Sequence, residues 1–190
     1  QINEINATGL YLPGDENLYL LLAEASAKLN DTAGEKAALT VVADHEGDSL
    51  PAASRLLEIA EDEKNWKDVA RWSEANIAIH PMGVSGWRGL LDASEQLHDN
   101  AHGIEAGLAL LNLQQPDIAS LHYRVAKLMA PTDVAGARRQ VLQALEEAPR
   151  FRAAYDLLST LPSSSSDAPS PTLVQTSATA PAASSAGTPQ

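Results

Sequence analysis

The chain has no cysteine, and only 4% of its residues are aromatic. Without thiols it can form neither a disulfide scaffold nor a thiolate metal site. Positive charge is scarce as well: 13 lysine and arginine residues stand against 25 aspartate and glutamate residues, giving a formal net charge of −12. Because nucleic acids and anionic membrane surfaces attract basic proteins, this balance argues against both as partners.

Long hydrophobic runs are missing too. No stretch reaches the roughly 18 apolar residues that a membrane-spanning helix needs, so we predict no membrane insertion in this segment. The chain begins at Gln1 without an initiator methionine, a basic region or an apolar signal core. We interpret it as part of a larger bacterial protein that resides in the cytoplasm or the cell envelope.

Alanine and leucine carry most of the apolar content, which is 44% of the residues and is typical of packed helices. Residues 1–12 are interpreted as a lead-in, and residues 13–161 show apolar side chains at helical spacing. Residues 162–190 are mostly serine, threonine, alanine and proline. Since they cannot bury enough apolar surface to offset the entropy of ordering, we predict a disordered tail.

Residues 13–161 predict about nine helices of three to four turns, with no competing strand pattern. Ser49 and Asn65 are expected to cap helices, and Pro51 to lie in a first turn, where a missing N–H donor costs nothing. Pro81, Pro116 and Pro149 each end a helix and stand at nearly even intervals. A period of about 34 residues with two helices per period indicates stacked helical hairpins.

The second helix of each predicted hairpin carries a recurring pattern. Small residues stand seven apart, a large apolar residue follows directly, and proline comes four residues later; Ala137, Ala144, Leu145 and Pro149 fit it fully. The unit ending at Pro81 fits in part, with Asn76 in place of a small residue. The matching positions of the two earlier units are Trp66, Val69, Ile77 and Pro81, then Gly103, Leu111 and Pro116.

This pattern resembles the tetratricopeptide repeat (TPR), and related two-helix repeats such as Sel1-like units or half-a-TPR solenoids also remain open. The resemblance implies an all-α, right-handed superhelical array of four hairpins and a final helix. A stacked array is also expected on physical grounds, because a single hairpin is apolar on both sides and only stacking neighbours can bury those faces.

In tetratricopeptide arrays the first helix of each hairpin lines a concave face that binds an extended peptide or a partner's helix. The resemblance therefore implies a groove formed by Glu58, Glu61 and Asp62, then Arg88, Asp92 and Glu95, then Tyr123, Arg124 and Lys127. Its middle would be acidic and its C-terminal end basic, so we expect a peptide ligand to carry positive charge. The alternative is a solvated face with internal salt bridges.

Catalytic patterns are not evident. His98 and His102 stand four apart, but they are predicted to lie on different helices, so a zinc site there is the least favoured hypothesis. "GVSGWRG" follows no strand and is not a dinucleotide-binding turn. We predict no catalytic, cofactor-binding or metal-binding residue. The three tryptophans are expected in the core, with Trp87 the one best placed to reach the groove.

The leading interpretation is a non-catalytic scaffold for protein–protein or inter-domain contacts. Its expected partner is a protein, a peptide or another domain of the same chain. One alternative is a repeat region that packs on an upstream hydrolase, such as a bacterial metallopeptidase, and assists substrate binding. A second alternative is a stand-alone adaptor that captures peptides.

Overall fold

The computed structural model describes residues 18–113 and 116–162. Within these ranges every regular element is an α-helix, so the predicted all-α fold without strands is confirmed for the described residues. The predicted lead-in, and the predicted tail from residue 163 onward, lie outside them. The nine helices in this part are α2 Leu18–Lys28, α3 Thr32–His45, α4 Leu50–Asp62, α5 Trp66–Ile79, α6 Val84–Leu97, α7 Asn100–Asn112, α8 Ile118–Met129, α9 Val134–Glu147 and α10 Arg152–Thr160.

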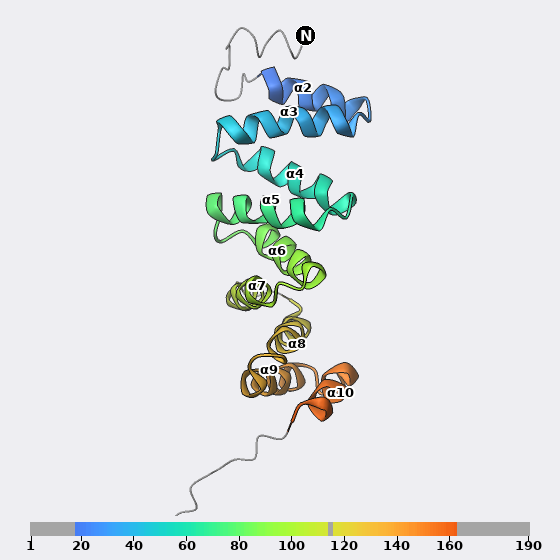
Figure 1. Cartoon of the computed structure of the whole chain (residues 1–190), viewed down its shortest axis with the longest axis vertical. Coiled ribbons are helices and arrows are strands. Elements are labelled where there is room, and N and C mark those ends of the chain that lie inside the picture. Colours follow the sequence, from blue (N-terminus) through green and yellow to red (C-terminus); the bar gives the residue numbers. More distant parts are fainter. Residues whose placement is uncertain (1–17, 114–115, 163–190) are drawn as a thin grey trace, which may run out of the picture.

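The helices follow one another along the long axis of the molecule (Figure 1). Helices α2 and α3, α4 and α5, α6 and α7, and α8 and α9 form hairpins, and α10 packs against α9. The main contacts join helices that are consecutive in the chain, and α4 also reaches α6. Such neighbour-to-neighbour packing is the arrangement of a repeat array rather than of a closed bundle.

The turn inside the first three hairpins repeats with the same geometry. Asn30, Lys64 and His98 follow the first helices with φ values of 57°, 54° and 58°. The residue after each of them donates its backbone N–H to a carbonyl five positions back, which satisfies the helix end. The regular repeat that the prolines indicate is therefore also present in the backbone conformation.

The residue just before each second helix occupies its N-cap position. Asp31, Asp99 and Asp133 accept the backbone N–H of the residue three positions later, which caps α3, α7 and α9. The expected caps Ser49 and Asn65 occupy the N-cap positions, and Pro51 lies in the first turn as predicted. Neither side chain makes a capping hydrogen bond, however, so that part of the expectation is wrong.

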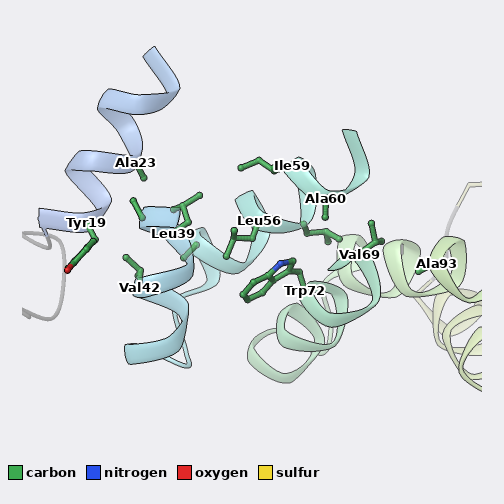
Figure 2. Packing of buried hydrophobic residues seen from close by; sticks show 13 residues of the cluster. Tyr19, Ala23, Leu39, Val42, Leu56, Ile59, Ala60, Val69, Trp72 and Ala93 are labelled. Carbon is green, nitrogen blue, oxygen red and sulfur yellow. The ribbon is translucent and has the colours of Figure 1, made fainter. Parts of the chain in front are cut away.

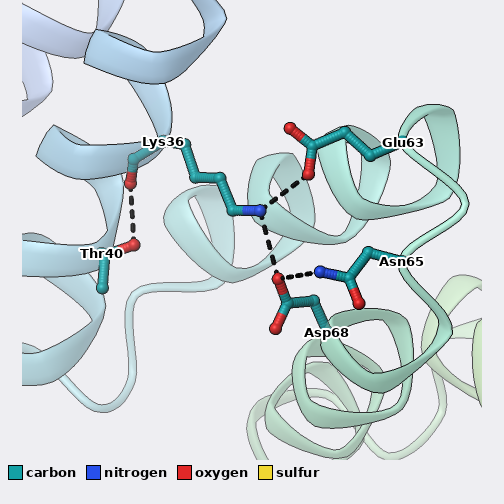
Figure 3. A network of polar contacts seen from close by, with 5 residues as sticks. All are labelled: Lys36, Thr40, Glu63, Asn65 and Asp68. Carbon is teal, nitrogen blue, oxygen red and sulfur yellow. Dashed lines mark hydrogen bonds and ion pairs between the residues drawn. The ribbon is translucent and has the colours of Figure 1, made fainter.

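The side chain of Asn65 bonds to a charged network instead of capping α5 (Figure 3). Its amide donates to Asp68 at 2.7 Å, and Lys36 donates to both Asp68 at 3.1 Å and Glu63 at 2.7 Å. These hydrogen bonds raise the pKa of Lys36. Because Lys36 belongs to α3 and its partners flank the α4–α5 turn, the network joins the first hairpin to the second.

The core forms three clusters of buried apolar residues along the array. The first runs from Tyr19 of α2 to Ala93 of α6, with Leu56, Val69 and Trp72 between them (Figure 2). Helix α6 also gives Leu90 and Leu91 to the second cluster, and α8 contributes to both the second and the third. The clusters therefore interlock through shared helices.

Helices α5 and α6 approach closely at Gly86. A Cβ atom there would lie 2.9 Å from Cγ1 of Ile77, 3.1 Å from Cβ of Asn76 and 3.1 Å from the backbone oxygen of Ser73. The last two atoms cannot move away by side-chain rotation. Hydrogen is therefore the only side chain that fits without separating the helices.

We predict that Gly86→Val lowers the free energy of unfolding by about 1–3 kcal/mol through overpacking. The control is Gly47→Val, since a Cβ at Gly47 meets nothing within 4 Å. Urea unfolding followed by circular dichroism measures both. Equal midpoints for the two variants would show that the α5–α6 approach is not tight.

Candidate functional site

A groove lies between the first helices of the second and third hairpins. Its volume is about 250 Å³, and it is lined by Ser54, Leu57, Glu58 and Glu61 of α4 and by Ser85 and Arg88 of α6. Three of the residues expected in the concave groove, Glu58, Glu61 and Arg88, are thus brought together. Leu57 is buried, and the two glutamates and Arg88 are exposed.

Asn76 of α5 holds Ser54, a residue of the groove wall, in place by a hydrogen bond. The hydroxyl of Ser54 donates to Oδ1 of Asn76 at 2.8 Å, and the Asn76 amide donates to the backbone oxygen of Trp72 at 3.0 Å. Asn76 is only 3% exposed. Its polar atoms are satisfied by these bonds, which explains how an amide is accommodated where the repeat pattern has a small residue.

Glu58 is already paired within the groove wall. Nη1 of Arg55 lies 2.8 Å from a Glu58 carboxylate oxygen, and Nε of Arg55 lies 2.6 Å from the buried carboxylate of Glu35. These two carboxylates raise the pKa of Arg55. Arg55 thus remains charged and holds Glu58 in place.

Glu61 has a different environment. It makes no ion pair within the described residues, and its carboxylate faces negative charge. Although Glu61 is exposed, the groove wall desolvates its carboxylate in part; this desolvation raises its pKa most, and the charges of Asp92, Glu58 and Asp62 add to the effect. The charged form of Glu61 is therefore disfavoured in the isolated protein, and a cation placed beside it would relieve that penalty.

The expected acidic middle and basic end of the groove are not separate regions. Nε of Arg124 lies 2.8 Å from Oε1 of Glu95, and Nη2 of the same side chain lies 2.5 Å from Oδ1 of Asp92. Burial would lower the pKa of Arg124, but its hydrogen bonds to Glu95 and Asp92 outweigh burial and raise it. The expected charge division is thus corrected: Arg124 of α8 pairs with two carboxylates of α6 and offsets part of their negative charge.

The other expected groove residues are placed as follows. Tyr123 is half-buried, and its ring centroid lies 5.1 Å from that of Phe151, so it packs toward α10. Asp62 and Lys127 are exposed, and Lys127 makes no ion pair within the described residues. On α4, Glu61 and Asp62 both carry negative charge and make no ion pair within the described residues.

The repeat positions occupy the helix–helix contacts. Val69, Ala137 and Ala144 are fully buried, and Gly103 is buried between Ser94 and Leu128. The partly buried positions are Trp66, Ile77, Leu111 and Leu145, and the exposed ones are Pro81, Pro116 and Pro149. Each proline lies beyond the end of a second helix.

The two neighbouring histidines belong to a turn and a helix. His98 ends α6, and His102 lies in α7 with Nδ1 2.7 Å from Oδ2 of the capping residue Asp99. This contact raises the pKa of His102 and lowers that of Asp99. Among the described residues there is no group of three or more histidine and acidic side chains that could hold a metal ion.

None of the helices described is both long and apolar enough to cross a bilayer.

No protein-family model matches the chain, and no curated protein matches its sequence. Solved structures do resemble it. The crystal structure of the MamA protein has a TM-score of 0.58 and 14% sequence identity, covering 74% of this chain and 77% of that one. A tetratricopeptide repeat protein from Parabacteroides merdae ATCC 43184 has a TM-score of 0.56 and 13% identity, covering 74% of this chain and 58% of that one.

These similarities and the repeated hairpins establish a tetratricopeptide-like fold for the described part of the chain. The resemblance inferred from Ala137, Ala144, Leu145 and Pro149 is confirmed at the level of the fold. Identity this low carries fold information only, so function has to be argued from the groove itself.

We predict that Arg124→Met lowers the free energy of unfolding by about 1–2 kcal/mol, because Asp92 and Glu95 lose a partly buried partner. The methionine retains the apolar stem of the side chain. Lys127→Met on the same helix is the matched control and should change stability by less than about 0.5 kcal/mol. If thermal unfolding gives the same loss for both variants, the link between α6 and α8 contributes no stability.

Proposed function

We propose that this chain is a non-catalytic interaction scaffold whose groove between α4 and α6 binds an extended protein segment bearing positive charge. The observation that carries the proposal is Glu61, a carboxylate with no ion pair among the described residues in a groove that already contains Glu58. A lysine or arginine of the partner would supply the missing counter-charge.

The size of the groove supports a side-chain ligand. Its volume of about 250 Å³ is below the range of about 300–1,000 Å³ that is typical of small-molecule pockets. The aliphatic stem of a long cationic side chain could lie along the groove wall, with its charged end beside Glu61. The serine hydroxyls of Ser54 and Ser85 add polar groups along the wall.

Ion pairs within this face support the choice of Glu61 over its neighbours. Asp92, Glu95 and Glu58 each have an arginine partner, so a ligand would have to compete with Arg124 or Arg55 for them. Glu61 makes no ion pair within the described residues, although Arg88 lines the same groove. The solvated-face alternative therefore describes Asp92 and Glu95 well, and the groove proposal rests on α4.

Whether the scaffold packs on an upstream hydrolase domain or acts as a stand-alone adaptor stays a prediction. Both a repeat region that packs on an upstream hydrolase and a stand-alone adaptor would use the same groove, and they differ in whether the cationic segment belongs to the same chain.

The proposal is tested by selecting random octapeptides from a display library on the immobilised full chain. We expect enrichment of peptides that contain lysine or arginine. Glu61→Gln should weaken a selected peptide about tenfold, as for a lost charged hydrogen bond. Glu146→Gln on α9 removes the same charge from an exposed site and is the matched control.

Two further readouts separate binding from folding. Glu61→Gln removes a charge that the folded state disfavours, so its melting temperature at neutral pH should equal or exceed that of the wild type. Affinity for the selected peptide should fall with added salt, and also as pH falls through the raised pKa of Glu61, because protonation removes the negative charge. Enrichment of acidic or uncharged peptides, or equal affinity of the Glu61→Gln variant, would contradict the proposal.

A further inference from the structure

A second pocket lies away from the groove, between the second helices of neighbouring hairpins. It has a volume of about 270 Å³ and is formed by α5, α6 and α7. Trp87 and Leu90 of α6 provide its apolar part, and Glu74, His102 and Glu105 provide polar groups. Trp87, the tryptophan expected to be best placed to reach the groove, lines this pocket instead, and the groove lining on α6 is Ser85 and Arg88.

The indole of Trp87 is held in a defined position. Its Nε1–H donates to the backbone oxygen of Pro81 at 2.8 Å, and the ring packs on the second core cluster. The side chain is nevertheless only partly buried. Because the hydrogen-bonding group of the ring is already satisfied, what the pocket offers to a ligand is an aromatic surface.

Negative charge accompanies this aromatic surface. Glu74 of α5 and Glu105 of α7 are both exposed, and neither makes an ion pair within the described residues. Both are close enough to His102 to help raise its pKa, after the larger effect of Asp99. Two carboxylates from different helices thus lie around one indole without a cationic partner from the described residues.

The same molecule shows how such a surface is used. The guanidinium of Arg71 lies 4.5 Å from the centroid of the Trp72 ring, and an Nη atom of Arg71 lies 3.6 Å from a carboxylate oxygen of Asp44. Arginine, tryptophan and carboxylate are all present there. At Trp87 the tryptophan and the carboxylates are present, and no arginine or lysine of the described residues stacks on the ring.

We propose that the pocket around Trp87 binds an arginine side chain of a partner protein. A planar guanidinium can stack on the indole and direct its N–H groups to Glu74 and Glu105 at the same time, which a lysine ammonium cannot do equally well. This site shares no lining residue with the α4–α6 groove, so the scaffold has a second contact point on another face. The inference does not depend on the proposed function of the groove.

The test uses the full chain labelled with ¹⁵N and the peptide acetyl-Gly-Arg-Gly-amide as the probe. Titration should shift the indole N–H signal of Trp87, assigned by its loss in Trp87→Phe, together with the backbone signals of His102 and Glu105. The neutral isostere acetyl-Gly-citrulline-Gly-amide should give no saturable shift. The lysine peptide should bind about two- to fivefold more weakly than the arginine peptide.

Glutamate-to-glutamine variants show whether the arginine peptide binds at the pocket around Trp87. Glu74→Gln and Glu105→Gln should each weaken the arginine peptide, whereas Glu146→Gln and Glu61→Gln should leave its affinity at this site unchanged. These surface substitutions avoid the partly buried Trp87, so folding is not at issue. Affinity should also fall as pH falls through the raised pKa of His102, because a protonated imidazole beside Glu74, Asp99 and Glu105 repels the guanidinium.

Equal binding of the citrulline peptide would overturn the proposal, since charge would then play no part. Shifts confined to the α4–α6 groove, or the same affinity in Glu74→Gln and Glu105→Gln as in the wild type, would also overturn it. If the groove binds no cationic peptide while the shifts at Trp87 persist, only the proposed function is refuted.

Discussion

The structure depends on the close approach of consecutive helices, which lets each hairpin bury its apolar faces on its neighbours. Hydrogen at Gly86 and methyl groups at Ala137 and Ala144 leave room for that approach. Helix α6 contributes to two core clusters, so the burial continues from hairpin to hairpin without a single central core. An array built this way grows in one direction and leaves two long faces exposed.

Those two faces carry different chemistry. On the face formed by the first helices, Arg55 and Arg124 each pair with two carboxylates, and Glu61 makes no ion pair within the described residues. On the face formed by the second helices, Trp87 lies between carboxylates of α5 and α7. In both places the proposed ligand is a cationic side chain, which agrees with the net charge of −12 and the scarcity of lysine and arginine.

Much of the fold could be predicted from the sequence, because helix ends are local events. The expected cap position Asn65 directly precedes α5, Trp66–Ile79, and Pro81, Pro116 and Pro149 indicate the period. A sharper signal lies in the N-cap residues of the second helices: Asp31, Asn65, Asp99 and Asp133 stand at even steps along the chain. Each of these residues has the short polar side chain that such a turn favours, and their spacing would have fixed the register of the first hairpin.

The candidate site was less predictable, because it depends on how helices far apart in the chain face each other. Projection of the repeat placed Glu58, Glu61 and Arg88 in one groove, which the geometry supports. It could not foresee that Arg124 reaches back to Asp92 and Glu95, since that contact is set by the distance between α6 and α8. Because adjacent residues of a helix point about 100° apart, placing Arg88 in the groove directs Trp87 away from it, as the structure shows.

Each hairpin of this array is stabilised mainly by packing against its neighbours rather than by one shared core. Native-state hydrogen exchange of the full chain carrying Val141→Ala tests it most directly, because Val141 is fully buried in α9 within the third cluster. The account predicts faster exchange in α8, α9 and α10, with the effect fading toward α3, whose amides should stay as protected as in the wild type. An equal increase in every helix would instead reveal one cooperative core and contradict the account.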